Sequence, residues 1–413
     1  MTVAVFAPAT ATVAGALRGV MPFVVPCKSA PDALLPIVRN AMWLASVVGG
    51  VCAAAVASVP LIGGAVGVPA AVLGQLGVLP WLLAATVLLV ALGQSATSVL
   101  VALGHSAQVM RAGLLSTATS VTLSVLLVGA PGPLPGYGLT GAGVAMLAAA
   151  LVGAWVNRST LRRRTVLAGR PLHPGRPDPR EMLRLAAVGI PLAGTVLIKF
   201  AVLGVLTFAA ARVGTDSAAV HSVSESLVNV MFAVAVAVGQ AMVPLTAGYA
   251  SAGDVAGLRR SLRAGVGLTL GAVAVLGAAL LLLRHSVVPL FTSDAALRPQ
   301  VVGQLPLVLL VVVTDALQAV AGFALIGLKR TTPSLVSTAV WFGALAAVAV
   351  PVAEAGGLTA LWAALACANL LQAVTKSVSF RTHSARVGAS ASSGGPGAPT
   401  DPAGALRNRG PAQ

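Results

Sequence analysis

Long apolar segments, separated by short stretches that carry polar residues, glycine or proline, make up most of the chain. A bilayer core needs about 20 apolar residues per helix, and by that measure the pattern predicts eleven membrane-spanning helices. The expected spans are 3–26, 41–64, 77–103, 110–129, 138–156, 185–211, 218–248, 264–283, 301–327, 333–353 and 357–379. The predicted fold class is therefore an all-α polytopic membrane protein.

Three short segments recur in the same order in the second half of the chain. The pairs are SAPD at 29–32 with SAGD at 251–254, LSTA at 115–118 with VSTA at 336–339, and GLTG at 138–141 with GLTA at 357–360. The common spacing of about 221 residues indicates a duplicated helix bundle. Shifted by this spacing, span 218–248 corresponds to a segment that starts before Met1. We therefore expect two pseudo-repeat bundles on a twelve-helix plan from which the first helix is missing.

The repeat and the loops divide the chain into four parts. We predict a truncated N-terminal helix bundle over 1–156, a basic cytoplasmic linker over 157–184, a six-helix C-terminal bundle over 185–379 and a disordered cytoplasmic tail over 380–413. The tail lacks the apolar residues that a packed structure requires. We interpret the basic residues of the linker as a signal that fixes the orientation of the chain in the membrane. The linker also joins two bundles that can rock against each other. Binding of anionic lipid headgroups is the alternative role of its basic residues.

Composition places this pattern in a lipid bilayer. Of the 413 residues, 57% are hydrophobic and 9% are charged, whereas a soluble domain has about 25% charged residues. The net charge of +16 does not indicate nucleic-acid binding, because the basic residues lie in loops between spans and only 4% of residues are aromatic. Of the 26 lysines and arginines, 21 fall on one side of the predicted membrane, which predicts a cytoplasmic C-terminus and a location in the cell membrane.

Ionisable side chains are rare inside the predicted spans. A charge near the bilayer centre costs at least about 2.5–3.5 kcal/mol on insertion scales, so such residues are functional candidates. Asp315 and Glu225 are the two carboxylates well inside spans, and Lys199 joins them. We predict that these three residues couple transport to a proton or another cation. For Asp315, the alternative is a purely structural ion pair with Lys199.

Neighbouring amide and hydroxyl groups predict where a substrate would bind. Gln318 follows Asp315 by one helical turn, and Ser226 and Asn229 belong to a polar stripe that begins at His221. We predict that the cavity is lined by Gln318, Asn229, Ser226 and Gln240. Hydrogen bonds between helices are the alternative role of the stripe. No His or Cys stands at ligand spacing from His221, so we predict no metal site.

Four segments carry a family resemblance. The segments at 213–227 (VGTDSAAVHSVSESL), 251–254 (SAGD), 290–297 (LFTSDAAL) and 314–343 resemble the multidrug and toxic compound extrusion (MATE) transporters, and the likeness covers roughly residues 20–379. The resemblance implies a two-lobed exporter of cationic or amphipathic compounds that exchanges its substrate for sodium ions or protons and needs no other cofactor. It also implies that Asp315 is a cation-binding carboxylate. Lys199 stands where the NorM-like pattern has a glutamate, which argues against sodium coupling and leaves proton coupling or an altered substrate charge.

The predicted function is ion-coupled efflux of small molecules across the cytoplasmic membrane by alternating access. The sequence has no nucleotide-binding loop, nucleophile elbow or His/Cys cluster, so we do not expect an enzyme. One alternative is a flippase for a lipid-linked sugar, which would favour a cavity with several arginines. With Arg111 and Lys376, near span ends, counted with a loop and the basic tail, only Arg18 and Lys199 fall within the predicted spans. The other is a truncated membrane protein that does not transport. The expected partners are a small-molecule substrate and lipid, and the sequence leaves the oligomeric state open.

Overall fold

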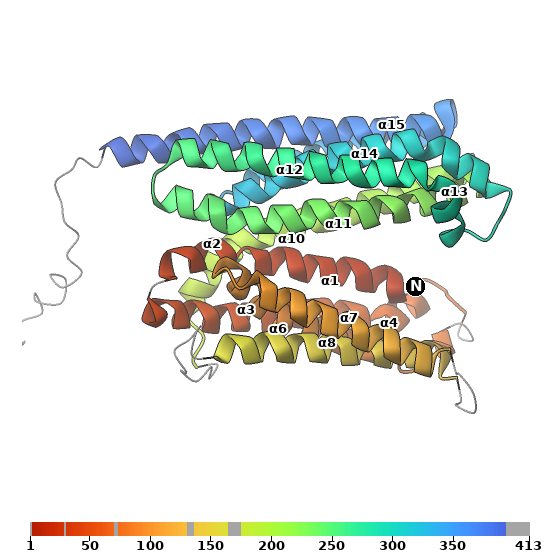
Figure 1. Ribbon diagram of the computed structural model, residues 1–413. Coiled ribbons are helices and arrows are strands. Elements are labelled where there is room, and N and C mark those ends of the chain that lie inside the picture. The colour runs from red at the N-terminus through yellow and green to blue at the C-terminus, as the bar shows by residue number, and fades with distance from the viewer. Residues whose placement is uncertain (1, 29, 70–72, 130–135, 164–174, 394–413) are drawn as a thin grey trace, which may run out of the picture.

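The computed structural model describes residues 2–28, 30–69, 73–129, 136–163 and 175–393, and this part of the chain folds into helices joined by short connections (Figure 1). The helices of the first half are α1 (Thr2–Arg18), α2 (Met21–Val24), α3 (Pro31–Ala57), α4 (Val59–Ala65), α6 (Leu79–Ala102), α7 (Ser106–Leu127) and α8 (Gly138–Arg162), with a 3-10 turn η1 (Val25–Cys27). Those of the second half are α10 (Pro179–Val213), α11 (Thr215–Ser251), α12 (Val255–Leu282), α13 (Arg284–Val287), α14 (Leu297–Gly327) and α15 (Thr332–Ser393), with a 3-10 turn η2 (Val288–Leu290).

Ten helical segments in the described part of the chain are long and apolar enough to cross a membrane. The last of them, within α15, is broken at Gly357, whose backbone angles are not helical (φ 64°, ψ −160°). The two halves of α15 account for two crossings, so the described residues contain the eleven spans that the hydrophobic pattern predicts. The prediction of an all-α polytopic membrane protein is confirmed.

The helices form two lobes that lie side by side (Figure 1). One lobe contains α1 to α8, and the other contains α10 to α15. Between the lobes, α1 packs on α10, and α2 and η1 contact α11. One apolar cluster belongs to the first lobe but extends to Leu192 and Phe323 of the second lobe, and another lies entirely within the second lobe.

Glycines allow the two lobes to approach closely at the α1–α10 contact. A Cβ atom added to Gly189 of α10 would lie 2.3 Å from the carbonyl oxygen of Ala16, and one added to Gly19 would lie 2.7 Å from the backbone nitrogen of Gly189. Backbone meets backbone here, so a side chain on either glycine has no space.

The internal repeat is visible in the backbone. Gly138 and Gly357 begin the recurring segments GLTG and GLTA, and both have positive φ angles, of 48° and 64°. That conformation suits glycine because other L-residues meet a steric penalty there. Each glycine marks the point at which the chain turns into the last spanning helix of its lobe.

The predicted tail boundary at residue 380 is wrong. Helix α15 continues to Ser393, and both Phe380 and Ser384 are fully buried. Phe380 packs in a small apolar cluster with Met242 and Leu258, which explains why the helix continues past the predicted last span. The rest of the predicted tail, 394–413, lies outside the described residues.

The linker in the structure is shorter than the predicted segment 157–184. Residues 157–162 continue α8, and α10 begins at Pro179, so both ends of the predicted segment 157–184 are helical. Just before α10, the chain docks on α3: the Trp43 indole Nε1 donates to the Gly175 carbonyl at 3.3 Å, and the Asp178 amide donates to Asn40 Oδ1 at 3.0 Å. Residues 164–174 lie outside the described part. The connection to α10 is therefore anchored to the first lobe.

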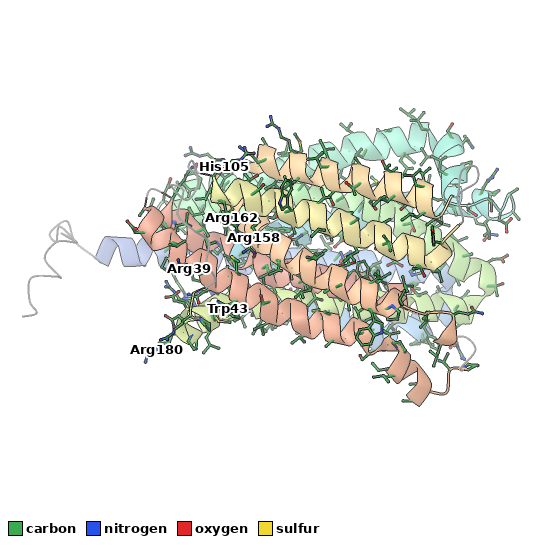
Figure 2. The ribbon with its side chains drawn as sticks, turned by 90° about the horizontal axis from the view of Figure 1, so that it is seen from below. Arg39, Trp43, His105, Arg158, Arg162 and Arg180 are labelled. Atoms are coloured by element: carbon green, nitrogen blue, oxygen red, sulfur yellow. The ribbon has the colours of Figure 1, made fainter. Side chains whose placement is uncertain are left out.

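Basic side chains gather at one end of the molecule. Figure 2 shows Arg39, Arg158, Arg162 and Arg180 at the end from which α15 leaves the bundle. This agrees with the one-sided distribution of lysine and arginine in the sequence. The chain is a multi-pass membrane protein, and the cytoplasmic orientation of this end stays a prediction.

Candidate functional site

A cavity of about 140 Å³ lies between the lobes, with walls from α1, α10, α11, α14 and α15. Three cationic side chains, Arg18, Lys199 and Lys376, contribute to its lining. Most of the remaining wall is apolar and includes Leu192, Val196, Phe232, Val236, Phe323 and Ile326. The cavity therefore combines positive charge with an apolar surface.

An ion pair between α10 and α14 lies at the wall of this cavity. Lys199 Nζ is 2.6 Å from Asp315 Oδ2, and Gln318 Nε2 donates to Asp315 Oδ1 at 2.7 Å. Asp315 is only 2% exposed. A carboxylate buried among apolar helices requires such partners, since desolvating it alone is costly. The structure therefore brings together Lys199, Asp315 and Gln318, as the sequence predicts, and both oxygens of Asp315 are occupied.

Gln318 connects this ion pair to a second lysine. Lys376, on the second half of α15, donates to Gln318 Oε1 and, at 3.1 Å, to Gln372 Oε1. Thr338 Oγ1 also donates to Gln372 Oε1, at 2.8 Å. Lys376 is 2% exposed, so its ammonium is buried with amide oxygens as its hydrogen-bond partners. The polar network thus runs from α10 through α14 to both halves of α15.

Sequence reasoning assigned Lys376 to the basic tail and missed its place in the cavity. The residue lies three positions before the end of the last predicted span, where a long side chain can usually reach the interface. The signal that could have placed it is Gln372, four residues earlier and on the same helical face.

Arg18 enters the cavity from the first lobe. Its guanidinium carbon lies 5.5 Å from the centre of the Phe323 ring, and Lys199 Nζ lies 3.9 Å from the centre of the Phe232 ring. Within the described residues, no carboxylate forms an ion pair with Arg18, and its buried Nε atom has no hydrogen-bond partner. The aromatic faces attract these cations without neutralising them.

Glu225 lies outside this network. Its carboxylate is 3.8 Å from His221 Nε2, and His221 Nδ1 accepts a hydrogen bond from the Trp362 indole at 3.2 Å. Within the described residues, no ion pair or hydrogen bond joins Glu225 to Asp315 or Lys199, although the positive charge of Lys199 acts on the Glu225 carboxylate at longer range. The buried His221 packs edge-on against the Trp362 ring.

Three of the predicted cavity residues do not line the cavity. Ser226 and Asn229 are exposed on α11, and Gln240 is half-buried. The Ser226 hydroxyl donates to the Ser222 carbonyl one turn earlier at 2.9 Å. Of the predicted set, Gln318 alone belongs to the cavity wall. In the part of the chain that the structure describes, no group of three His, Cys, Asp or Glu side chains is arranged to hold a metal ion.

Comparison with known proteins gives the same family as the sequence motifs. Residues 191–352 match the MatE family model. The chain is 32% identical over 170 residues to a probable multidrug resistance protein NorM of Aromatoleum aromaticum, covering 41% of this chain and 37% of that protein. It is also 32% identical over 239 residues to a probable NorM of Deinococcus radiodurans, covering 56% of this chain and 52% of that protein. The chain thus spans between about a third and about half of the length of these curated relatives.

The fold agrees with these matches. An outward-facing conformation of a multidrug resistance MATE family transporter superimposes on 92% of this chain and 86% of its own, with a TM-score of 0.81 at 15% sequence identity. The predicted resemblance is therefore confirmed, and the fold is that of a MATE transporter. The matched proteins are named as transporters and resistance proteins, which agrees with the prediction that the chain is not an enzyme.

Proposed function

We propose that this chain, a MATE-family membrane protein, exports small amphipathic compounds across the cell membrane by alternating access between its two lobes. The observation that carries the proposal is the cavity between the lobes, which is lined by Lys199, the ion-pair partner of the buried Asp315. An ionisable pair inside a membrane is expensive to bury, which favours a functional role. The similarity to probable multidrug resistance proteins supports efflux as the direction of transport.

The contact between the lobes supplies a place about which they can rock. Because Gly19 and Gly189 have no side chains, the backbones of α1 and α10 lie close together at this contact. Residues of both lobes line the cavity. In transporters built from two repeats, rigid-body rocking around a fixed site opens that site to each side in turn. We propose that the α1–α10 contact is the pivot of this motion.

Asp315 is proposed as the residue that couples the cavity to an ion. Both of its oxygens already have partners, and three cationic side chains surround the same cavity. A sodium ion needs several oxygen ligands and would have to displace both partners of the carboxylate, whereas a proton needs only one oxygen of Asp315, removes the carboxylate charge and releases Lys199. The arrangement thus favours the proton over sodium. Glu225 stays a predicted coupling residue, placed on α11 beside His221.

The charge of the substrate decides whether protonation of Asp315 weakens or strengthens substrate binding. A cationic substrate competes with the proton for Asp315, which gives the antiport that the sequence predicts. A substrate that depends on free positive charge in the cavity binds better once Asp315 is protonated. The flippase alternative belongs to the second class, and Lys376 supports it because it raises the number of cations at the cavity from the two predicted to three.

Transport by the full chain in lipid vesicles tests the proposed function. We would load vesicles with fluorescent amphipathic dyes of positive, zero and negative charge, and follow their release with and without a pH gradient. Asp315→Asn should remove the response to the gradient, while Asp216→Asn, the same change at an exposed site, should not. If the wild-type chain moves none of the dyes faster than empty vesicles, the efflux proposal fails and the transport-inactive alternative takes its place.

A further inference from the structure

Charge is unbalanced around the cavity. Arg18, Lys199 and Lys376 line it, and among the described residues Asp315 is the carboxylate that pairs with a member of this set. Lys376 contacts neutral amide oxygens, and Arg18 packs against the Phe323 ring. Arg18 and Lys376 therefore have no carboxylate in direct contact among the described residues, and Asp315 is linked to Lys376 only through Gln318, in apolar surroundings where an unpaired charge is costly. An anion bound in the cavity would supply the missing negative charge beside Arg18 and Lys376.

The two cations without a carboxylate in direct contact come from different lobes. Arg18 ends α1 of the first lobe, and Lys376 lies in α15 of the second lobe. Their chemistry is complementary: a guanidinium offers a planar pair of donors to carboxylate, sulfonate or phosphate oxygens, and an ammonium offers a compact charge. A single anionic group held by both would link the lobes through the ligand.

The rest of the cavity defines the body of such a ligand. Phe232, Phe323 and the aliphatic wall offer apolar contact beside the cations. The volume of about 140 Å³ is smaller than the roughly 300–1,000 Å³ of a site that encloses a drug-sized ligand. In this conformation, the cavity thus fits the charged end of a ligand and the first part of its apolar body.

We propose that the cavity selects amphipathic anions, with Arg18 and Lys376 holding the anionic group and Asp315 regulating the availability of Lys199. This proposal rests on the proposed efflux function and names its substrate class. It replaces the cationic compounds predicted from the sequence with compounds that carry a carboxylate, sulfonate or phosphate group. While Asp315 is charged it holds Lys199 in an ion pair, and Arg18 and Lys376 are the cations that remain for the anion.

Two probes that differ in charge test the substrate class. Naphthalene-sulfonate and naphthyl-trimethylammonium share an aromatic ring and carry opposite charges. Binding of each to the full chain in detergent micelles would be measured by calorimetry. We expect the sulfonate to bind more tightly, and Arg18→Gln and Lys376→Gln each to weaken it by about tenfold or more, since each removes a charged hydrogen bond. Arg212→Gln is the matched control, because Arg212 pairs with Glu354 at an exposed site of α10.

The outcomes separate this proposal from efflux itself. Tighter binding of the ammonium probe, equal binding of both probes, or no binding of the sulfonate overturns the proposal of an anion site. Equal losses in Arg18→Gln and Arg212→Gln also overturn it, because they indicate a general surface effect. Transport of cationic but not of anionic dyes by vesicles that contain the chain would leave the efflux function intact while excluding the anionic class. Absence of all transport would instead count against the efflux function.

Discussion

Lys199 and Asp315 lie 116 positions apart in sequence, on α10 and α14, yet their charged atoms are 2.6 Å apart at the wall of the cavity. The carboxylate is buried, whereas the lysine side chain keeps 24% of its surface accessible. The lysine is thus the partner that can turn toward a ligand. This asymmetry makes the pair suited to act as a switch as well as a structural link.

Exchanging the two charges tests the pair directly. Lys199→Asp or Asp315→Lys alone brings like charges together and should destabilise the chain, while the double variant should recover about 1–3 kcal/mol of that loss. Thermal unfolding of the wild type, both single variants and the double variant in detergent would measure the coupling. Additive losses in the double variant would contradict direct pairing.

Lys376 should contribute to binding at the expense of stability. Its buried charge has amide oxygens as hydrogen-bond partners, and Lys376→Gln removes that charge while retaining an amide that can donate to Gln318. We expect an unchanged or higher Tm together with an affinity for naphthalene-sulfonate about tenfold lower. A Tm that falls by more than about 5 °C would instead indicate that the ammonium is mainly structural.

The α1–α10 contact should not tolerate a side chain. In Gly189→Ala, the new Cβ would lie 2.3 Å from the Ala16 carbonyl oxygen, and backbone atoms cannot move aside as a flexible side chain can. We expect a loss of about 1–3 kcal/mol, typical of overpacking, measured as a lower Tm. Gly204→Ala on the same helix meets no atom within 4 Å and should be neutral or stabilising. Equal Tm values for the two variants would exclude a tight contact at Gly189.

The sequence predicts much of this site because a bilayer restricts which residues a membrane-spanning helix can carry. A charge within an apolar helix must find a partner, so the sequence alone indicates Lys199 as a partner for Asp315. The helix count follows from span length, and the break at Gly357 agrees with the repeat that relates it to Gly138.

Other features depend on three-dimensional packing. Lys376 resembles part of the tail because the apolar pattern weakens there, but α15 continues to Ser393 and keeps this lysine inside the bundle. The polar stripe on α11 pointed to Ser226 and Asn229 as cavity residues. Serine hydroxyls can bond the carbonyl one turn earlier on their own helix, as Ser226 does, so polar spacing alone does not show which neighbour a helix face meets.

Removing the carboxylate charge of Asp315 should affect the two probes in opposite directions. Asp315→Asn frees Lys199 from its ion pair, so naphthalene-sulfonate should bind more tightly and naphthyl-trimethylammonium more weakly. Calorimetry at one pH on the wild type and the variant would measure both changes. Asp216→Asn, the same change at an exposed site of α11, is the matched control, and equal changes in the two variants would contradict a specific role of Asp315.

Membrane potential provides the last test, because an anion that crosses without a proton carries net charge and is driven out of an inside-negative compartment, whereas a proton and an anion that cross together carry none. A potential of about 100 mV contributes about 2.3 kcal/mol per charge, enough for roughly a 50-fold concentration difference of a monovalent anion. In vesicles that contain the full chain, a potassium diffusion potential should drive naphthalene-sulfonate toward the positive side. Arg18→Gln and Lys376→Gln should slow this movement, and Arg212→Gln should not. Vesicles without protein provide the leak rate, since a sulfonate crosses lipid slowly. Sulfonate movement that follows only an imposed sodium gradient and ignores the potential would contradict both the anionic substrate class and the assignment of Asp315 to protons.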